Sequence, residues 1–233
     1  MQKFNIWLLL LLLIFIPIYP KFPLLGISGS FVAVRLEDFL ILFVVGSWGL
    51  QNRNRLAELL KKPVNRAIAL YLLIGFFALF SGIFLTRLVD IKVGLLHAFR
   101  RVEYMALFFV AYDFFVTKRH LALFTKSILV VSSLVAFYGL GQVYLGFPVI
   151  STSNSEFSKG LALTLGAGAR INSTFAGHYD LAAFSVFPLL LITGLLAISA
   201  KPRWLLLILG AAAHWTLLLS ASRVSFASFV VCA

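Results

Sequence analysis

The sequence predicts an all-α fold: a polytopic membrane helix bundle with about seven complete transmembrane helices and the start of an eighth, forming one transmembrane domain over residues 1–233. Three observations predict it. Of the 233 residues, 61% are hydrophobic, and the mean hydropathy is +1.01. Only eight residues are acidic, too few for the polar surface of a soluble protein of this hydrophobicity. Apolar runs long enough to cross a bilayer recur along the whole chain.

Each predicted span is an apolar run near the 20 or so residues that a helix needs to cross the hydrocarbon core. The first follows Lys3 and resembles a signal peptide, but Pro17 to Pro20 offers no small-residue cleavage site, so we expect a retained helix. An eighth span starts at about Val224 and covers about half of a crossing, which predicts a truncated chain. The seven complete spans are 5–20, 29–50, 67–85, 95–116, 121–145, 178–199 and 204–221.

The basic residues predict the orientation of these spans. The short segments 51–66, 117–120 and 200–203 are densely basic, which marks them as cytoplasmic. They alternate along the chain with segments near 21–35, 86–100, 146–177 and 220–225, which we therefore place outside. The N-terminus is then cytoplasmic, and 146–177 is the longest outer loop.

The net charge of +12 would suggest nucleic acid in a soluble chain. Here the basic residues fall mainly between apolar spans, so the expected partner is the lipid bilayer and no nucleic acid is expected. The sequence carries no G-x-S-x-G elbow, P-loop or dinucleotide fingerprint, which leaves serine hydrolases, ATPases and Rossmann enzymes without support. No metal site is expected either, because His178 and Asp180 supply fewer than the three protein ligands that zinc requires.

Basic residues should be scarce in short outer segments, yet several arginines fall at or near that side. Arginine suits phosphate, because its planar fork donates two hydrogen bonds and stays charged when partly desolvated. Arg170 and Arg223 have no local acidic neighbour, so we predict that they bind an anionic ligand, with a snorkelling side chain as the alternative. Two other arginines have a structural alternative, since Arg35 lies three residues before Asp38 and Arg100 three residues before Glu103.

Two polar residues mark the start of the span 178–199. Asp180 is predicted to cap this helix by accepting backbone N–H groups, or to contact an acceptor. His178 is a weak candidate for a base or for a group that binds an acceptor sugar, and the alternative is a bystander at the interface.

Two motifs connect these residues to a known family. The first is Arg-x-x-Ser-Thr-Phe-x-Gly-His-Tyr-Asp-Leu-Ala-Ala-Phe over 170–184, which leads into an apolar helix containing Pro188. The second is Leu-Leu-Leu-Ser-Ala-Ser-Arg over 217–223. Together with the basic aromatic stretch at 99–104, they resemble the superfamily of O-antigen ligases and O-antigen polymerases.

The resemblance implies a multi-pass glycosyltransferase of the bacterial cytoplasmic (inner) membrane that builds lipopolysaccharide or another cell-surface polysaccharide. Such an enzyme takes a glycan from an undecaprenyl-diphosphate carrier on the outer leaflet and joins it to an acceptor hydroxyl on the lipid A core, a protein or a growing polysaccharide. It implies no cofactor or metal. By motif, Arg170 and Arg223 would bind the diphosphate, and Arg100 or Arg101 would assist.

The family's catalytic histidine lies in a large extracytoplasmic loop that would follow Ala233, so the resemblance assigns no catalytic residue here. Whether the chain acts as a ligase or a polymerase stays open. Two alternatives remain at this point: a transporter or flippase of lipid-linked glycan, and an inactive truncated fragment.

Overall fold

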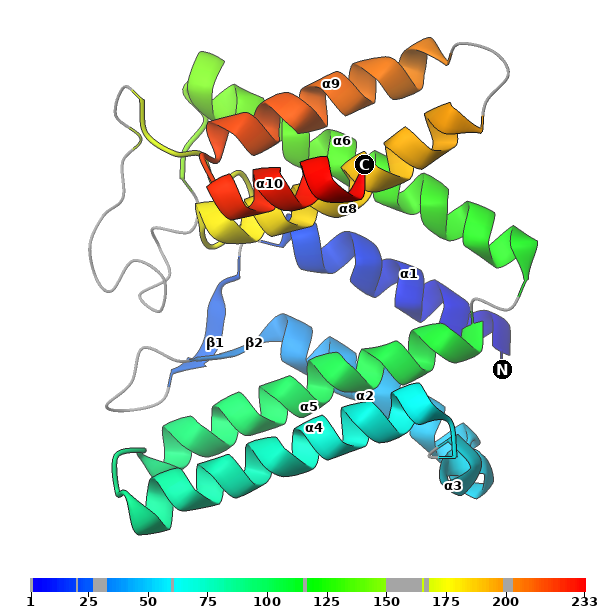
Figure 1. The fold of residues 1–233 in the computed structure, drawn as a ribbon, viewed down its shortest axis with the longest axis vertical. Helices are drawn as coiled ribbons and strands as arrows, with labels where there is room; N and C mark the ends of the chain where they lie inside the picture. Colours follow the sequence, from blue (N-terminus) through cyan, green and yellow to red (C-terminus); the bar gives the residue numbers. More distant parts are fainter. Residues whose placement is uncertain are drawn as a thin grey trace. The chain divides into compact units, whose positions relative to one another are not determined.

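The structure is a computed structural model that describes residues 2–19, 21–26, 33–59, 61–114, 117–149, 165, 168–198 and 203–233. Within these ranges the regular secondary structure is helical apart from one two-stranded sheet, so the predicted all-α class is confirmed (Figure 1). The chain forms two compact units. Unit 1 contains Met1–Leu12 and Leu25–Leu121, and unit 2 contains Leu13–Leu24 and Ala122–Ala233.

The helices lie at the predicted positions, with ends that differ by a few residues. Most of the predicted outer loop 146–177, the last residue of the predicted span 178–199, and residues 200–202 of the last predicted cytoplasmic segment lie outside the described residues. The elements are α1 (Gln2–Ile18), β1 (Pro23–Gly26), β2 (Ala33–Arg35), α2 (Leu36–Gln51), the 3-10 turn η1 (Arg53–Arg55), α3 (Leu56–Leu59), α4 (Pro63–Phe80), the π-helical turn η2 (Ser81–Leu85), α5 (Ile91–Phe114), α6 (Lys118–Tyr144), α8 (His178–Ala197), α9 (Trp204–Leu219) and α10 (Arg223–Cys232).

One predicted helix start was wrong. Within the described part of the predicted span 29–50, the helix begins at Leu36, and the three residues before it form strand β2, which pairs with β1. Residues 29–32 lie outside the described residues. The reason is local. Arg35 has an extended backbone, and its N–H donates to the Asp38 carboxylate at 2.9 Å, as expected of a residue just outside a helix N-terminus.

Among the described residues, three helices are long and apolar enough to cross a membrane, as expected of a membrane protein: Pro63–Leu85, Lys118–Tyr144 and His178–Ala197. Three further apolar helices are shorter, Ile6–Ile18, Trp204–Leu219 and Arg223–Cys232. The membrane character of the chain therefore rests on these helices, and seven complete crossings stay a prediction.

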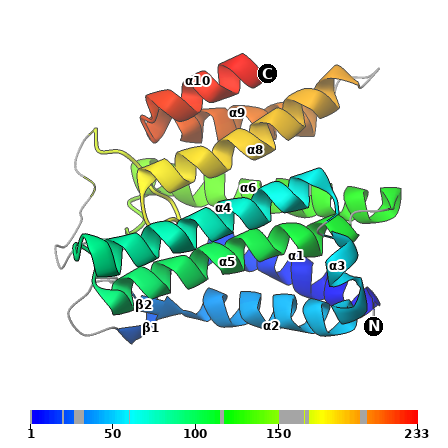
Figure 2. The ribbon, with the colours of Figure 1, turned by 60° about the horizontal axis from the view of Figure 1, so that its bottom comes forward.

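In unit 1, helices α2 and α4 each pack against α5, and α4 runs alongside α5 in both views (Figures 1 and 2). The buried side of α2 carries Ile41, Val44 and Trp48, spaced by three or four residues as one helix face requires. Near the ends of the helices, the Trp48 indole N–H donates to the Asp113 carboxylate at 2.9 Å.

In unit 2, helix α8 packs against α9 and α10, and the three helices lie side by side in Figure 2. Their shared core contains Ala182 and Leu189 of α8 and Ala213 and Leu217 of α9. A second buried cluster joins α6 to the segment before α8. It contains Val131, Val135, Ile171, Phe175 and Leu181, and it fixes the position of the polar motif described next.

Candidate functional site

The motif 170–184 begins as an irregular segment that is unusually buried for a loop. Ile171 and Ser173 are 0% and 1% exposed, and Asn172 is also buried. A loop buried in this way must find partners for its backbone N–H and C=O groups. The side chains of α6 provide several of them.

Gln142 of α6 holds the backbone of Ser173 with both ends of its amide. The Ser173 N–H donates to Gln142 Oε1 at 2.8 Å, and Gln142 Nε2 donates to the Ser173 carbonyl at 3.2 Å. The Ser173 hydroxyl donates to the Val135 carbonyl at 2.7 Å. Ser173 has φ of 52°, a left-handed conformation that is unfavourable for a non-glycine residue, so these bonds hold a strained turn.

Further contacts fix the rest of the segment. Asn172 Nδ2 donates to the Phe175 carbonyl at 2.9 Å, and the Thr174 hydroxyl donates to the Pro17 carbonyl at 2.6 Å. Gly139 of α6 lets the segment approach closely, because a Cβ at this position would lie 3.2 Å from Ile171 Cδ1 and 3.3 Å from Ser173 Cβ. The segment is therefore a fixed platform that ends at the first residue of α8.

The second motif, 217–223, lies against the first. The Ile171 N–H donates to the Leu219 carbonyl at the end of α9, at 3.3 Å. Ala221 then turns the chain with φ of 53°, and Ser222 caps α10 by accepting from the Ser225 N–H. Arg170 directly precedes Ile171, and Arg223 lies four residues after Leu219. Both arginines are exposed.

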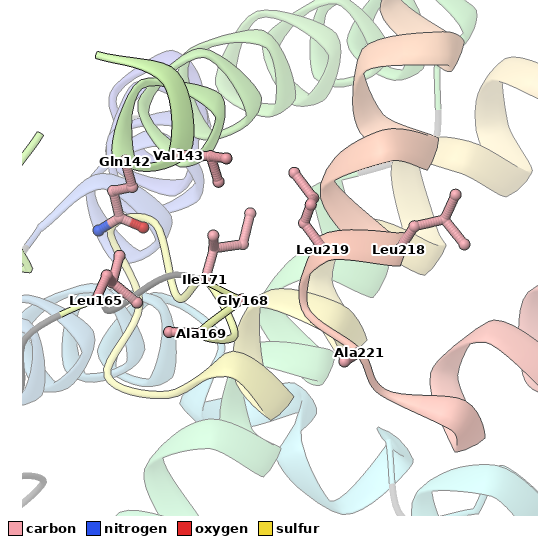
Figure 3. A pocket seen from close by; sticks show the side chains of 9 residues that line it. All are labelled: Gln142, Val143, Leu165, Gly168, Ala169, Ile171, Leu218, Leu219 and Ala221. Carbon is pink, nitrogen blue, oxygen red and sulfur yellow. The ribbon is translucent and has the colours of Figure 1, made fainter. Parts of the chain in front are cut away.

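Two cavities adjoin the junction and share Leu165 and Ala169 as lining residues. The larger has a volume of about 430 Å³ and lies between the end of α6 and the end of α9 (Figure 3). Gln142 and Ile171 line it, with Ala221 at the turn before α10. The smaller has a volume of about 210 Å³ and is lined by Arg170, Asn172 and His178 among others.

Arg170 and His178 contact each other at the smaller cavity. Arg170 Nη1 lies 3.2 Å from His178 Nε2. Because a guanidinium can only donate, Nε2 is the acceptor, and the imidazole is the neutral tautomer with its proton on Nδ1. The ring of Tyr179 lies beside the imidazole, with centroids 4.0 Å apart. The sequence did not predict that these two residues would meet.

Asp180 does not occupy the predicted cap position. The N-cap of α8 is Gly177, with no side-chain cap hydrogen bond, and Asp180 is the third residue of the helix. Its carboxylate turns back toward the helix start, since a Cβ built on Gly177 would lie 3.8 Å from Asp180 Oδ2. From this position it complements the positive end of the helix dipole without capping it.

The remaining two predicted ligands, Arg100 and Arg101, lie in unit 1. Arg100 Nη2 donates to the Ala33 carbonyl at 2.6 Å and contacts Asp38 Oδ2 at 3.4 Å. This contact links α5 to α2, and Arg100 also interacts electrostatically with Glu103, the partner that the sequence spacing suggests. Arg101 is exposed and lies over the Tyr71 ring, 5.8 Å from the centroid.

Arg100 belongs to a buried ionic cluster at the start of α2. Arg35 pairs with Glu37 at 3.2 Å, and the Tyr104 hydroxyl donates to the same Glu37 oxygen at 3.2 Å. The predicted pairing of Arg35 with Asp38 is made through the Arg35 backbone N–H. In this cluster Arg100 contacts the acidic residue Asp38, as expected if the role of Arg100 is structural.

The residue that sequence analysis missed is Gln142. Its signal was present, because an amide within the apolar run 121–145 needs a partner inside the protein. Among the described residues, no group of three or more His, Cys, Asp or Glu side chains is placed to hold a metal ion.

No protein-family model, curated protein or solved structure matches this chain. The family resemblance therefore continues to depend on the two motifs themselves. The structure contributes a separate fact. Ile171 and Leu219, 48 positions apart in the sequence, meet at one junction of unit 2 with two adjoining cavities.

Proposed function

We propose that this chain is a membrane glycosyltransferase of the O-antigen ligase and polymerase type, located in the bacterial cytoplasmic membrane. In this proposal it takes a glycan from an undecaprenyl-diphosphate carrier on the outer leaflet and joins it to an acceptor hydroxyl of the lipid A core, a protein or a growing polysaccharide. The observation that carries the proposal is the hydrogen bond from Ile171 to Leu219, which joins the two arginine-bearing motifs.

The chemistry of the reaction explains why arginines are needed there. When the acceptor oxygen attacks the anomeric carbon, the bond to the diphosphate breaks and negative charge develops on the departing phosphate oxygens. Fixed guanidinium groups stabilise that charge without a metal, because each donates paired hydrogen bonds in a rigid geometry. Arg170 follows the shared cavity wall at Ala169 and precedes a segment that Gln142 holds in place, so its backbone position is fixed before the ligand arrives.

We expect Arg170→Ala and Arg223→Ala each to lower glycan transfer by about 100-fold, the usual effect of removing one transition-state donor. The measurement is surface polysaccharide and accumulated lipid-linked glycan in cells that lack their own copy of the gene and carry the variant. Arg119→Ala, in the predicted cytoplasmic segment 117–120, is the matched control and should leave transfer unchanged. Undiminished transfer by an Arg170→Ala/Arg223→Ala double variant, at equal protein level in the membrane, would contradict the proposal.

A further inference from the structure

The contact between Arg170 and His178 is an unusual arrangement for an anion site. With Arg170 Nη1 donating to His178 Nε2 at 3.2 Å, the imidazole presents a lone pair toward the same region as the guanidinium. Both side chains line the 210 Å³ cavity. An anion that reaches Arg170 therefore meets a second polar group that, in its neutral tautomer, accepts hydrogen bonds and cannot donate one from Nε2.

Burial, and then the charges nearby, favour the neutral imidazole of His178. The guanidinium at 3.2 Å and the positive end of the α8 dipole both disfavour an imidazolium. Asp180, two residues after His178, favours the imidazolium. Of the described elements packed on α8, helix α9 carries His214, whose ring lies beside Phe226 and Phe229, and α10 begins at Arg223. The charged groups that act on His178 are Arg170 and Asp180.

A bound diphosphate diester reverses this balance. It brings two negative charges within reach of Nε2, which outweigh the single positive charge of Arg170. A proton taken from solvent onto Nε2 then turns the imidazole from an acceptor into a charged donor. Arg170 and the protonated His178 would then both donate to the diphosphate, in place of one donor and one acceptor.

We infer that His178 takes up one proton when a diphosphate binds at Arg170, so that ligand binding at this cavity is coupled to protonation. The inference deepens the proposed function, because it depends on Arg170 being a diphosphate ligand. It assigns His178 a role as a positioning donor for the ligand. Affinity should then fall as pH rises, by up to about tenfold per pH unit for a one-proton coupling.

The experiment is titration calorimetry of the full chain in lipid nanodiscs with P1,P2-dimethyl diphosphate, a diester whose own charge is constant near neutral pH. Each titration is run in two buffers of different ionisation enthalpy, from about pH 6 to about pH 8, where histidine titrates. We expect an uptake of about one proton per ligand and the corresponding fall in affinity with rising pH. His178→Gln should still bind, but with no proton uptake and a flat pH profile.

A matched control is His97→Gln, which alters an exposed histidine of unit 1 and should leave both proton uptake and pH dependence unchanged. Binding by the unaltered chain without proton uptake would overturn this inference and leave the proposed function standing. So would a pH dependence that persists in His178→Gln. An absence of binding that Arg170→Ala does not change would instead remove the diphosphate site, and with it both proposals. Thermal unfolding of each variant separates loss of binding from loss of fold.

Discussion

Ser173 has a left-handed backbone in a buried segment, and its neighbours explain how that conformation persists. A non-glycine residue with positive φ costs of the order of 1–3 kcal/mol. Gln142 supplies both a donor and an acceptor to the Ser173 backbone, and the Ser173 hydroxyl reaches the Val135 carbonyl. The geometry of the candidate site thus depends on one amide side chain that touches neither predicted arginine.

At this scale we expect Gln142→Leu to lower the free energy of unfolding by about 2–4 kcal/mol, because it leaves the buried Ser173 N–H and carbonyl without these partners. The measurement is thermal unfolding in detergent. Thr193→Ala is the control, since within the described part of the chain the Thr193 hydroxyl bonds only to the Leu189 carbonyl of its own helix, at 2.9 Å. An equal loss for the two variants would show that the amide does not hold the turn.

The site residues differ in how far sequence alone could place them. Arg170 and Arg223 were singled out because they lack acidic neighbours, which is visible in the sequence. The contact between Arg170 and His178 was not predictable, because it depends on the path of the turn between them. Asp180 lies three positions after the N-cap that it was predicted to be, since an aspartate in the first turn and one at the N-cap look alike in sequence.

At the scale of the element, α5 shows how a helix with charged residues can belong to an apolar chain. Its Arg100 contacts Asp38 and the Ala33 carbonyl, and its Tyr104 contacts Glu37. The Arg100 and Asp38 side chains are 13% and 9% exposed. Charges that are buried in this way are tolerated because each contacts a group of opposite charge or a hydrogen-bond acceptor.

We therefore expect Arg100→Ala to destabilise the protein by about 3 kcal/mol, since it leaves Asp38 buried beside fewer cations. Arg101→Ala, which alters the exposed neighbour, should change stability by less than about 1 kcal/mol. Thermal unfolding of the two variants in the same detergent makes the comparison. If Arg101→Ala proved as damaging as Arg100→Ala, the buried cluster would not explain the difference between these adjacent arginines.

At the scale of the whole molecule, the helices were predictable and the strands were not. Each of the seven predicted apolar runs contains a helix, the structure that would satisfy the backbone hydrogen bonds of a span in hydrocarbon. Strands β1 and β2 are only four and three residues long, too short for an alternating pattern to be recognised within an apolar sequence. The division into two compact units likewise follows from packing.

The predicted crossing of α5 can be tested by the side on which its two ends lie. In a Cys232→Ser background, Leu88→Cys and Arg119→Cys place single thiols before and after α5, at exposed positions. A membrane-impermeant maleimide should label Leu88→Cys in intact cells and Arg119→Cys only after permeabilisation. Labelling of both thiols from one side would mean that α5 does not cross.

The hydrogen bond from Thr174 to the Pro17 carbonyl also has a consequence for biogenesis. The two residues are 157 positions apart, and at 5–20 residues per second the ribosome needs roughly 10–30 s to make the segment between them. The end of the first helix must therefore wait for this partner until α6 and the segment after it have been made. Until then the Pro17 carbonyl lacks the Thr174 hydroxyl, so the arginine-bearing turn cannot complete its contacts early in synthesis.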